Sequence, residues 1–181
     1  QSAINHNIKL EVFGRGKKWV NYGTKMHEVQ SYISNIPDDE IIVFFDAFDT
    51  LILADEKEFK EKYQAFNDKI TDVNKKDLIF SNGRNCIKYF KHCFLETNGG
   101  LFIGKSKKMK DLFSTINKKY NWKINGSGDV LLERFRNRFS IDCNYDLFYN
   151  YYFDGFIQQI GTNSRFKKQI KVDIKQAKNN V

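Results

Sequence analysis

Two aspartates follow a run of apolar residues in this sequence and are the side chains best suited to chemistry. Ile41–Phe45 is a continuous β-branched and aromatic stretch, and Asp46 and Asp49 come soon after it. Such a run is typical of a strand buried on both faces, so the sequence predicts a strand that delivers both carboxylates to the rim of a sheet. Because side chains three positions apart in a strand face opposite ways, the carboxylates converge only where the chain turns. Converging carboxylates repel each other, and Mg²⁺ or Mn²⁺, which prefer oxygen ligands, relieve that repulsion.

The motif by itself leaves several interpretations open. Phe48 lies between the two aspartates and can offer a flat face on which a nucleobase stacks. Two solvated acids in a strand-to-helix loop give the same pattern. Two metal-dependent enzyme classes also fit, namely haloacid-dehalogenase-like phosphatases and sugar-nucleotide glycosyltransferases with an Asp-x-x-Asp motif. A phosphatase needs an acid two residues after its nucleophilic aspartate, and Phe48 and Leu51 occupy those positions, so the spacing argues against it.

A second polar motif precedes another apolar stretch. Asn98 is followed by Gly99 and Gly100 and then by Leu101–Ile103. A glycine pair permits close approach of the backbone to a ligand or a positive φ angle, and the asparagine amide can hydrogen-bond sugar hydroxyls. A plain turn before a strand is the alternative interpretation.

The elements that must position these motifs alternate between strand-like and helix-like patterns, which predicts an α/β domain around a largely parallel sheet. Strands are expected at Ile8–Phe13, Ile41–Phe45, Leu78–Phe80 and Leu101–Ile103. Four helices are expected. One is capped by Thr24 and has Met26, Val29, Ile33 and Ile36 inward, and one starts from Asp55 and has Phe59, Tyr63, Phe66 and Ile70 inward. A third is capped by Ser106 and has Met109, Leu112, Phe113, Ile116 and Tyr120 inward, and a fourth starts near Asp129 and carries Val130, Leu131 and Phe135.

Composition limits the class of protein. The 181 residues suit a single domain, 1–181, and 41% are hydrophobic, which suffices for a core. No run approaches the ~20 apolar residues of a membrane span. The net charge of +8 allows an alternative, a non-catalytic basic module that binds a polyanion. The excess lysines are spread along the chain, however, as on a solvated surface. No nucleic-acid partner is expected. Cys86 and Cys93 could bridge in an oxidising compartment or stay free thiols.

The motifs taken together resemble the glycosyltransferase domain of the multifunctional collagen lysyl hydroxylases, and in particular its giant-virus relatives, over about residues 1 to 150. The resemblance rests on Gly14-Arg15-Gly16-Lys17-Lys18-Trp19, Gly23-Thr24-Lys25, Asp46-Ala47-Phe48-Asp49, Ile79-Phe80-Ser81-Asn82, Cys86, Asn98-Gly99-Gly100-Leu101-Phe102-Ile103-Gly104 with Thr97 ahead of it, Gly128-Asp129-Val130, Ile141-Asp142-Cys143 and Leu147-Phe148-Tyr149-Asn150. The glycine-pair motif is one residue short of the family pattern.

The resemblance implies a GT-A-like fold and transfer of a hexose from UDP-glucose or UDP-galactose, with Mn²⁺ or Mg²⁺, to a hydroxyl. The implied acceptor is hydroxylysine or galactosyl-hydroxylysine of a collagen-like polypeptide, in the secretory-pathway lumen or a virus-infected host cell. The implied site has Asp46 and Asp49 on the metal, Phe48 on uracil, Lys25 on the phosphates, Trp19 on donor or acceptor, Asn98, Gly99 and Gly100 along the hexose, and Asp129 as the acid near the sugar or acceptor.

The chain also departs from the family pattern at both ends. The family begins with a buried strand that carries nucleotide contacts, whereas Gln1-Ser2-Ala3 resembles the helix after it. A later family strand carries a His that completes the metal site, and this sequence stops at Val181, where that strand would begin. The resemblance therefore implies a sheet without its first and last strands and a metal site with fewer protein ligands.

Overall fold

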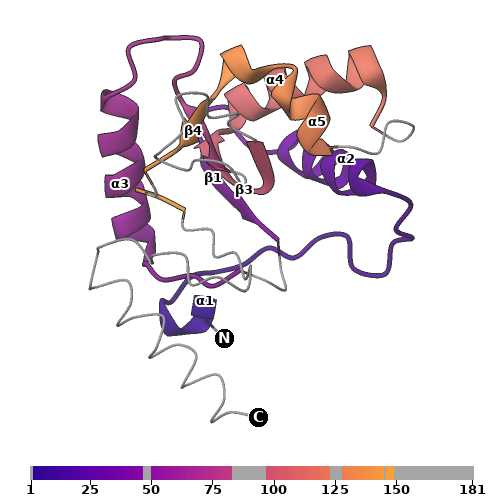
Figure 1. Ribbon diagram of the computed structural model, residues 1–181. Coiled ribbons are helices and arrows are strands. Elements are labelled where there is room, and N and C mark those ends of the chain that lie inside the picture. Colours follow the sequence, from indigo (N-terminus) through magenta and orange to yellow (C-terminus); the bar gives the residue numbers. More distant parts are fainter. Residues whose placement is uncertain (1, 47–49, 83–96, 123–127, 145, 149–181) are drawn as a thin grey trace, which may run out of the picture.

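A computed structural model describes residues 2–46, 50–82, 97–122, 128–144 and 146–148. The described elements, in chain order, are α1 (Ser2–Asn5), α2 (Tyr22–Ile33), β1 (Ile41–Phe45), α3 (Glu56–Asp68), β2 (Leu78–Asn82), β3 (Thr97–Lys105), α4 (Ser106–Tyr120), α5 (Gly128–Glu133), the 3₁₀ helix η1 (Arg136–Arg138) and β4 (Ser140–Asp142). The expected α/β class is confirmed, as a mixed four-stranded sheet flanked by helices (Figure 1).

The four strands lie in the order β1-β3-β2-β4. β3 is antiparallel to both β1 and β2, whereas β2 and β4 are parallel. β1, β2 and β4 therefore run in one direction, as the alternation of strands and helices predicts, and β3 runs in the opposite direction between them. This reversal brings the first residues of β3 beside the last residues of β1 and β2.

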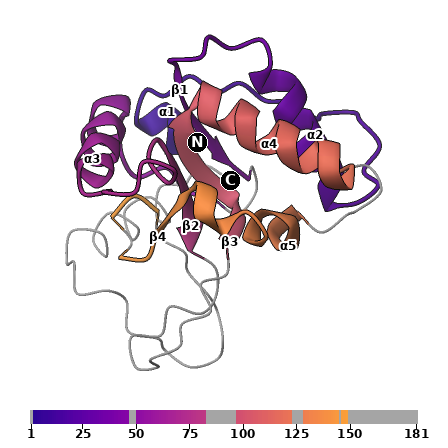
Figure 2. The same ribbon diagram turned by 90° about the horizontal axis from the view of Figure 1, so that it is seen from above.

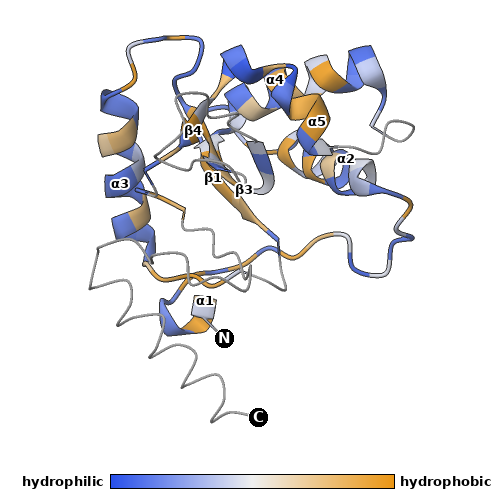
Figure 3. Cartoon of the chain, in the orientation of Figure 1, coloured by the Kyte–Doolittle hydropathy of each residue, from blue (hydrophilic) through white to orange (hydrophobic). Residues whose placement is uncertain are grey.

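Helices cover both faces of the sheet, because strand side chains alternate between them. Viewed from above, α3 lies on one side of the strands, and α2 and α4 lie on the other (Figure 2). In β2, Ile79 packs into the cluster that contains Tyr63 of α3, while Leu78 and Phe80 pack into the larger cluster under α2, α4 and α5. Figure 3 shows the corresponding division, with hydrophilic residues on the outer sides of α3 and α4 and hydrophobic residues in the strands.

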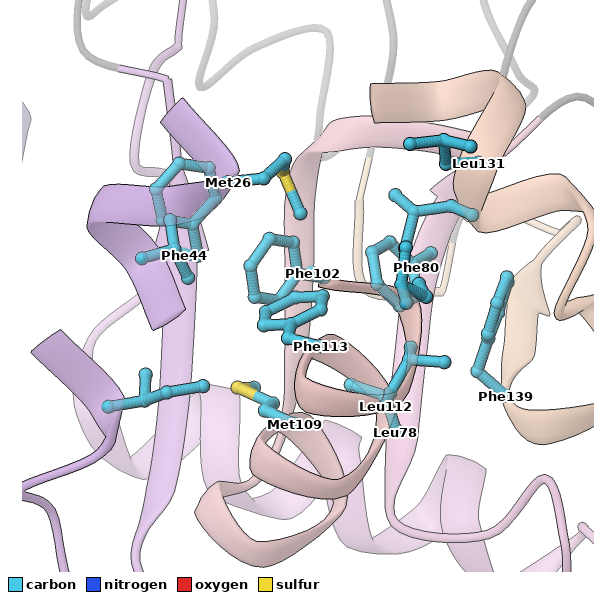
Figure 4. Packing of buried hydrophobic residues seen from close by; sticks show 14 of the residues in the cluster. Met26, Phe44, Leu78, Phe80, Phe102, Met109, Leu112, Phe113, Leu131 and Phe139 are labelled. Atoms are coloured by element: carbon cyan, nitrogen blue, oxygen red, sulfur yellow. The ribbon is translucent and has the colours of Figure 1, made fainter. Parts of the chain in front are cut away.

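Aromatic rings hold the three neighbouring strands β1, β3 and β2 together on the larger face (Figure 4). Phe102 of β3 is fully buried, with its ring centroid 4.7 Å from that of Phe44 in β1 and 4.9 Å from that of Phe80 in β2. Phe113 of α4 meets Phe102 edge-on at 5.7 Å. Such pairs contribute about 0.5–1.5 kcal/mol each beyond area burial, so they fix the strand ends that carry the polar residues described below.

Helices form where the sequence predicts them, but their ends differ from the expectation. Ile36, Ile70 and Phe135 lie beyond the last residues of α2, α3 and α5, and Val130 of α5 is exposed. Met26, Val29 and Ile33 are buried as expected, but α2 begins at Tyr22 with Asn21 as its N-cap, and the predicted cap Thr24 is the third helical residue. The Thr24 hydroxyl accepts the Asn21 backbone N–H at 3.3 Å, which is half of a capping box. Ser106 is likewise the first helical residue of α4 and not its cap.

Two strand expectations were wrong. Ile8–Phe13 forms no strand, since no described strand pairs with it and only Phe13 packs on the core, with its ring 5.3 Å from Tyr32. β1 was expected to be buried on both faces, yet Phe44 is its only buried residue, since within the described sheet β1 lies at an edge and pairs with β3 alone. No helix among the described residues is long and apolar enough to cross a membrane.

Candidate functional site

Polar residues gather where β1, β2 and β4 end and β3 begins. Asp46 directly follows β1, Asn82 ends β2 and Asp142 ends β4, while Thr97 is the first residue of β3. Asn82, Thr97 and Asp142 are all buried. In α/β sheets ligands bind beyond the carboxyl ends of the parallel strands, which makes this edge the candidate site.

Lys25 and Asp46 meet at this edge, although they are 21 residues apart in the chain. The Lys25 ammonium lies 3.2 Å from Oδ1 and 3.1 Å from Oδ2 of Asp46. Its nitrogen is also 6.0 Å from the centroid of the Phe44 ring. The lysine side chain is 19% exposed and the aspartate side chain 40% exposed, so the carboxylate remains open to a ligand while the ammonium lies beneath it.

The backbone of Asp46 is fixed to the glycine-pair motif. Its N–H donates to the carbonyl of Gly100 at 2.9 Å, which extends the β1·β3 ladder by one residue. A Cβ added at Gly100 would lie 2.8 Å from Oδ2 of Asp46 and 3.0 Å from the side-chain oxygen of Asn98. A side chain at position 100 would therefore require the Asp46 carboxylate to shift, and the expected approach of a ligand to this glycine pair stays a prediction.

The glycine-pair motif is a bulge on one side of β3. Along β2 the pairing changes from Phe80 with Phe102 to Ser81 with Asn98, so the residues between Asn98 and Phe102 bulge away from β2, whereas the ladder with β1 continues without a break. The Asn98 side-chain oxygen accepts the N–H of Gly100 at 2.8 Å within the bulge. The sugar-binding role predicted for Asn98 stays a prediction.

Two carboxylates of α5 hold the start of β3. Asp129 accepts the N–H of Gly99 at 2.9 Å. Glu133, one helical turn later, accepts both the N–H of Thr97 at 3.1 Å and its hydroxyl at 2.6 Å. Asp129 therefore lies at the candidate site, with the backbone N–H of Gly99 as its partner. Its catalytic role stays a prediction. Sequence reasoning missed Glu133, whose signal was its spacing of four residues from Asp129 on one helix face.

The remaining predicted site residues lie outside this set of contacts. Phe48 and Asp49 fall outside the described residues, so the convergence of Asp49 with Asp46 stays a prediction. Trp19 is 57% exposed and meets the ring of Tyr22 edge-on at 5.8 Å. It follows a turn in which Gly14 and Gly16 have φ angles of +81° and +76°, the left-handed region that glycine adopts without strain.

Metal ligands in the described part of the chain are few. No group of three or more His, Cys, Asp or Glu side chains gathers there as for a metal ion. Cys143 forms no disulfide within the part of the chain that the structure describes. The possible Cys86–Cys93 bridge lies outside the described residues.

Asp142 shapes the chain after β4. Its buried carboxylate accepts the backbone N–H groups of Asp146, Leu147 and Phe148 at 2.8, 2.7 and 2.7 Å. Burial raises the pKa of this carboxyl, and the three N–H groups offset part of the rise. Phe148 is thereby directed into the hydrophobic cluster with Tyr63 of α3.

This carboxyl should make the folded state less stable as pH rises. Above its usual pKa of about 3.9 and up to its raised value, the folded protein binds more protons at Asp142 than the unfolded chain does. The free energy of unfolding therefore falls through that window, by at most about 1.4 kcal/mol per pH unit. Urea unfolding between pH 4 and 7 should show a steeper fall for the wild type than for Asp142→Asn, and equal slopes would contradict the assignment.

Comparison with known proteins identifies the family. The family model described as the PLOD GT domain matches residues 1–123, more than half of the chain. A search of curated proteins found no match. The matched stretch includes Trp19, Lys25, Asp46 and the glycine pair, while Asp129 lies beyond it. The mixed sheet flanked by helices is compatible with a GT-A-like domain, and the family match favours glycosyl transfer over the phosphatase alternative. The chain therefore belongs to the PLOD GT domain family and is a glycosyltransferase domain like that of the collagen lysyl hydroxylases.

Proposed function

We propose that this glycosyltransferase moves a hexose from UDP-glucose or UDP-galactose to the hydroxyl of hydroxylysine or galactosyl-hydroxylysine in a collagen-like polypeptide, and that it depends on Mn²⁺ or Mg²⁺. In the reaction the bond between the anomeric carbon and the β-phosphate oxygen breaks, and UDP leaves with the bonding electrons. A new bond forms between that carbon and the acceptor oxygen, whose proton passes to a neighbouring carboxylate or to water.

The observation that carries the proposal is the pairing of Lys25 with Asp46 over Gly100. A cationic and an anionic side chain from different elements meet at the end of β1, and the carboxylate stays partly exposed. A divalent cation and a diphosphate need groups of this kind side by side, because hard cations take carboxylate oxygens and phosphates take ammonium donors.

The described residues fit a cation that has few protein ligands. Mg²⁺-like ions in nucleotide sites often take one or two carboxylates and draw their other ligands from phosphates and water. Asp46, with Asp49 as the predicted second ligand, would hold such an ion, and both Asp46 oxygens already face a positive charge. When bound, the ion stabilises the negative charge that develops on the leaving diphosphate.

The other residues position the donor. Lys25 binds the diphosphate, and the Asn98 amide and the glycine-pair backbone line the hexose. Asp129, which holds the N–H of Gly99 in the described structure, orients the sugar or the incoming hydroxyl. Phe48 stacks on uracil, and Trp19 offers its exposed ring to donor or acceptor.

Removal of the metal should abolish activity. UDP release from UDP-glucose or UDP-galactose, with a galactosyl-hydroxylysine peptide as acceptor, is expected to fall more than about hundredfold when EDTA replaces Mn²⁺, because the leaving group loses its main electrostatic stabilisation. Excess Mn²⁺ should restore it. Equal rates with and without EDTA would contradict metal dependence.

Two further assays separate the alternatives. Turnover of p-nitrophenyl phosphate without UDP release would favour a phosphatase. Salt-sensitive binding to DNA without UDP binding would favour a basic binding module, whose affinity falls steeply as salt rises.

A further inference from the structure

Lys25 holds Asp46 as a metal ion would hold it. Its ammonium faces both carboxylate oxygens at nearly equal distances, 3.2 and 3.1 Å. The glycine at position 100 keeps the other side of Oδ2 free of a Cβ. The carboxylate thus has a positive partner in the ligand-free protein.

It costs free energy for a divalent cation and this ammonium to bind the Asp46 carboxylate at the same time. Two positive charges against the same pair of oxygens repel each other, and the site is only partly open to water that would screen them. The ammonium sits on four rotatable methylene groups, so it can leave while the backbone of α2 stays in place.

The place of Lys25 near the start of α2 favours an anionic partner for its ammonium group. It lies in the first helical residues of α2, which begins at Tyr22. The positive end of the helix dipole disfavours a cation there and favours negative charge. Asp46 supplies that negative charge in the ligand-free protein. When a metal ion occupies Asp46, the diphosphate of a nucleotide bound beside the metal supplies it instead.

We propose that Lys25 is an exchangeable counter-ion, which occupies Asp46 until a divalent cation displaces it and then binds the diphosphate. The inference rests on the proposed function. It makes metal and nucleotide binding cooperative, because metal alone must displace Lys25 without compensation, whereas metal together with UDP gives the ammonium a new partner.

The test measures binding, without turnover, on the full chain. Mn²⁺ binding is titrated by electron paramagnetic resonance without nucleotide, and UDP binding by calorimetry at saturating Mn²⁺. Lys25→Met should bind Mn²⁺ alone about tenfold more tightly and UDP about tenfold more weakly than the wild type, since each tenfold change reflects one lost charge contact. Lys25→Arg, which keeps the charge, should bind Mn²⁺ alone as weakly as the wild type, and its thermal melting checks that position 25 tolerates substitution.

Lys110→Met is the matched control. Lys110 pairs with Asp38 at 2.8 Å, and its removal changes the net charge equally. Neither affinity should change in this variant. The inference is overturned if Lys25→Met leaves Mn²⁺ affinity unchanged or weakened while the wild type binds Mn²⁺ and UDP. Absence of both Mn²⁺ and UDP binding in the wild type overturns the proposed function and the inference with it.

Discussion

Replacement of Asp46 by asparagine is expected to lower hexose transfer at least about hundredfold. The amide keeps the shape of the side chain and the backbone bond to Gly100, but it removes the charge that faces Lys25. Loss of one electrostatic group that stabilises developing charge typically costs 10²–10³ in rate. Initial rates of UDP release at saturating donor and Mn²⁺ measure the effect.

A surface aspartate offers a control for this change. Asp38 is also paired with a lysine, Lys110, and its side chain is 61% exposed. The hydrogen bond from Lys110, together with its positive charge, lowers the pKa of Asp38 below its usual range. Asp38→Asn should retain wild-type activity because it lies away from the contacts at the strand ends. If Asp46→Asn keeps more than a tenth of the wild-type rate, Asp46 is not a metal ligand.

Replacement of Gly23 by alanine is expected to destabilise the protein by about 3 kcal/mol, near the upper range for overpacking. A Cβ at Gly23 would lie 1.8 Å from the carbonyl oxygen of Trp122 and 2.7 Å from its carbonyl carbon. These are backbone atoms, and the Trp122 indole is fully buried with its ring 6.3 Å from Phe113. The contact can therefore relax only by moving α2 away from the core. Urea unfolding followed by tryptophan fluorescence measures the loss.

Gly128→Ala is the matched control for that substitution. A Cβ there would lie 3.3 Å from the Cγ of Met26, the flexible side chain of a neighbouring helix. Gly128 is the first residue of α5, where alanine also favours the helix by up to about 1 kcal/mol. This variant should stay within about 1 kcal/mol of the wild type. A Gly23→Ala protein as stable as Gly128→Ala would show that α2 does not pack on Trp122 as described.

The sequence predicts the helices well, because their stability depends on a local stripe of apolar residues. Met109, Leu112 and Phe113 of α4 are examples, all buried as their spacing predicts. The capping residue of α2 is less certain from sequence, since Asn21 and Thr24 are both good N-caps and the capping box uses both. Apolar alternation alone does not make a strand, as Ile8–Phe13 shows, because a strand also needs a partner.

The candidate site is predicted only in part. Asp46 can be found from its place after an apolar run, and Lys25 from the family resemblance, but their contact depends on how α2 packs beside β1. The reversed direction of β3 and the bond between Thr97 and Glu133, 36 residues apart, are decided by tertiary structure. Donor sugar, acceptor and viral origin stay predictions.

The one-sided bulge of β3 has a consequence for how such domains diversify. β1 pairs with β3 in one register from Ile41 to Phe45, although the pairing of β3 with β2 shifts between Phe80 and Ser81. The additional residues of β3 bulge on the β2 side alone. An insertion or deletion at Asn98 and Gly99 therefore leaves the five β1·β3 pairs from Ile41–Lys105 to Phe45–Leu101 in place, while it changes the backbone that meets Asp46 and Asp129. This is also where the motif of the present chain is one residue short of the family pattern, so we expect the length of the chain to vary at this point while the sheet keeps its register.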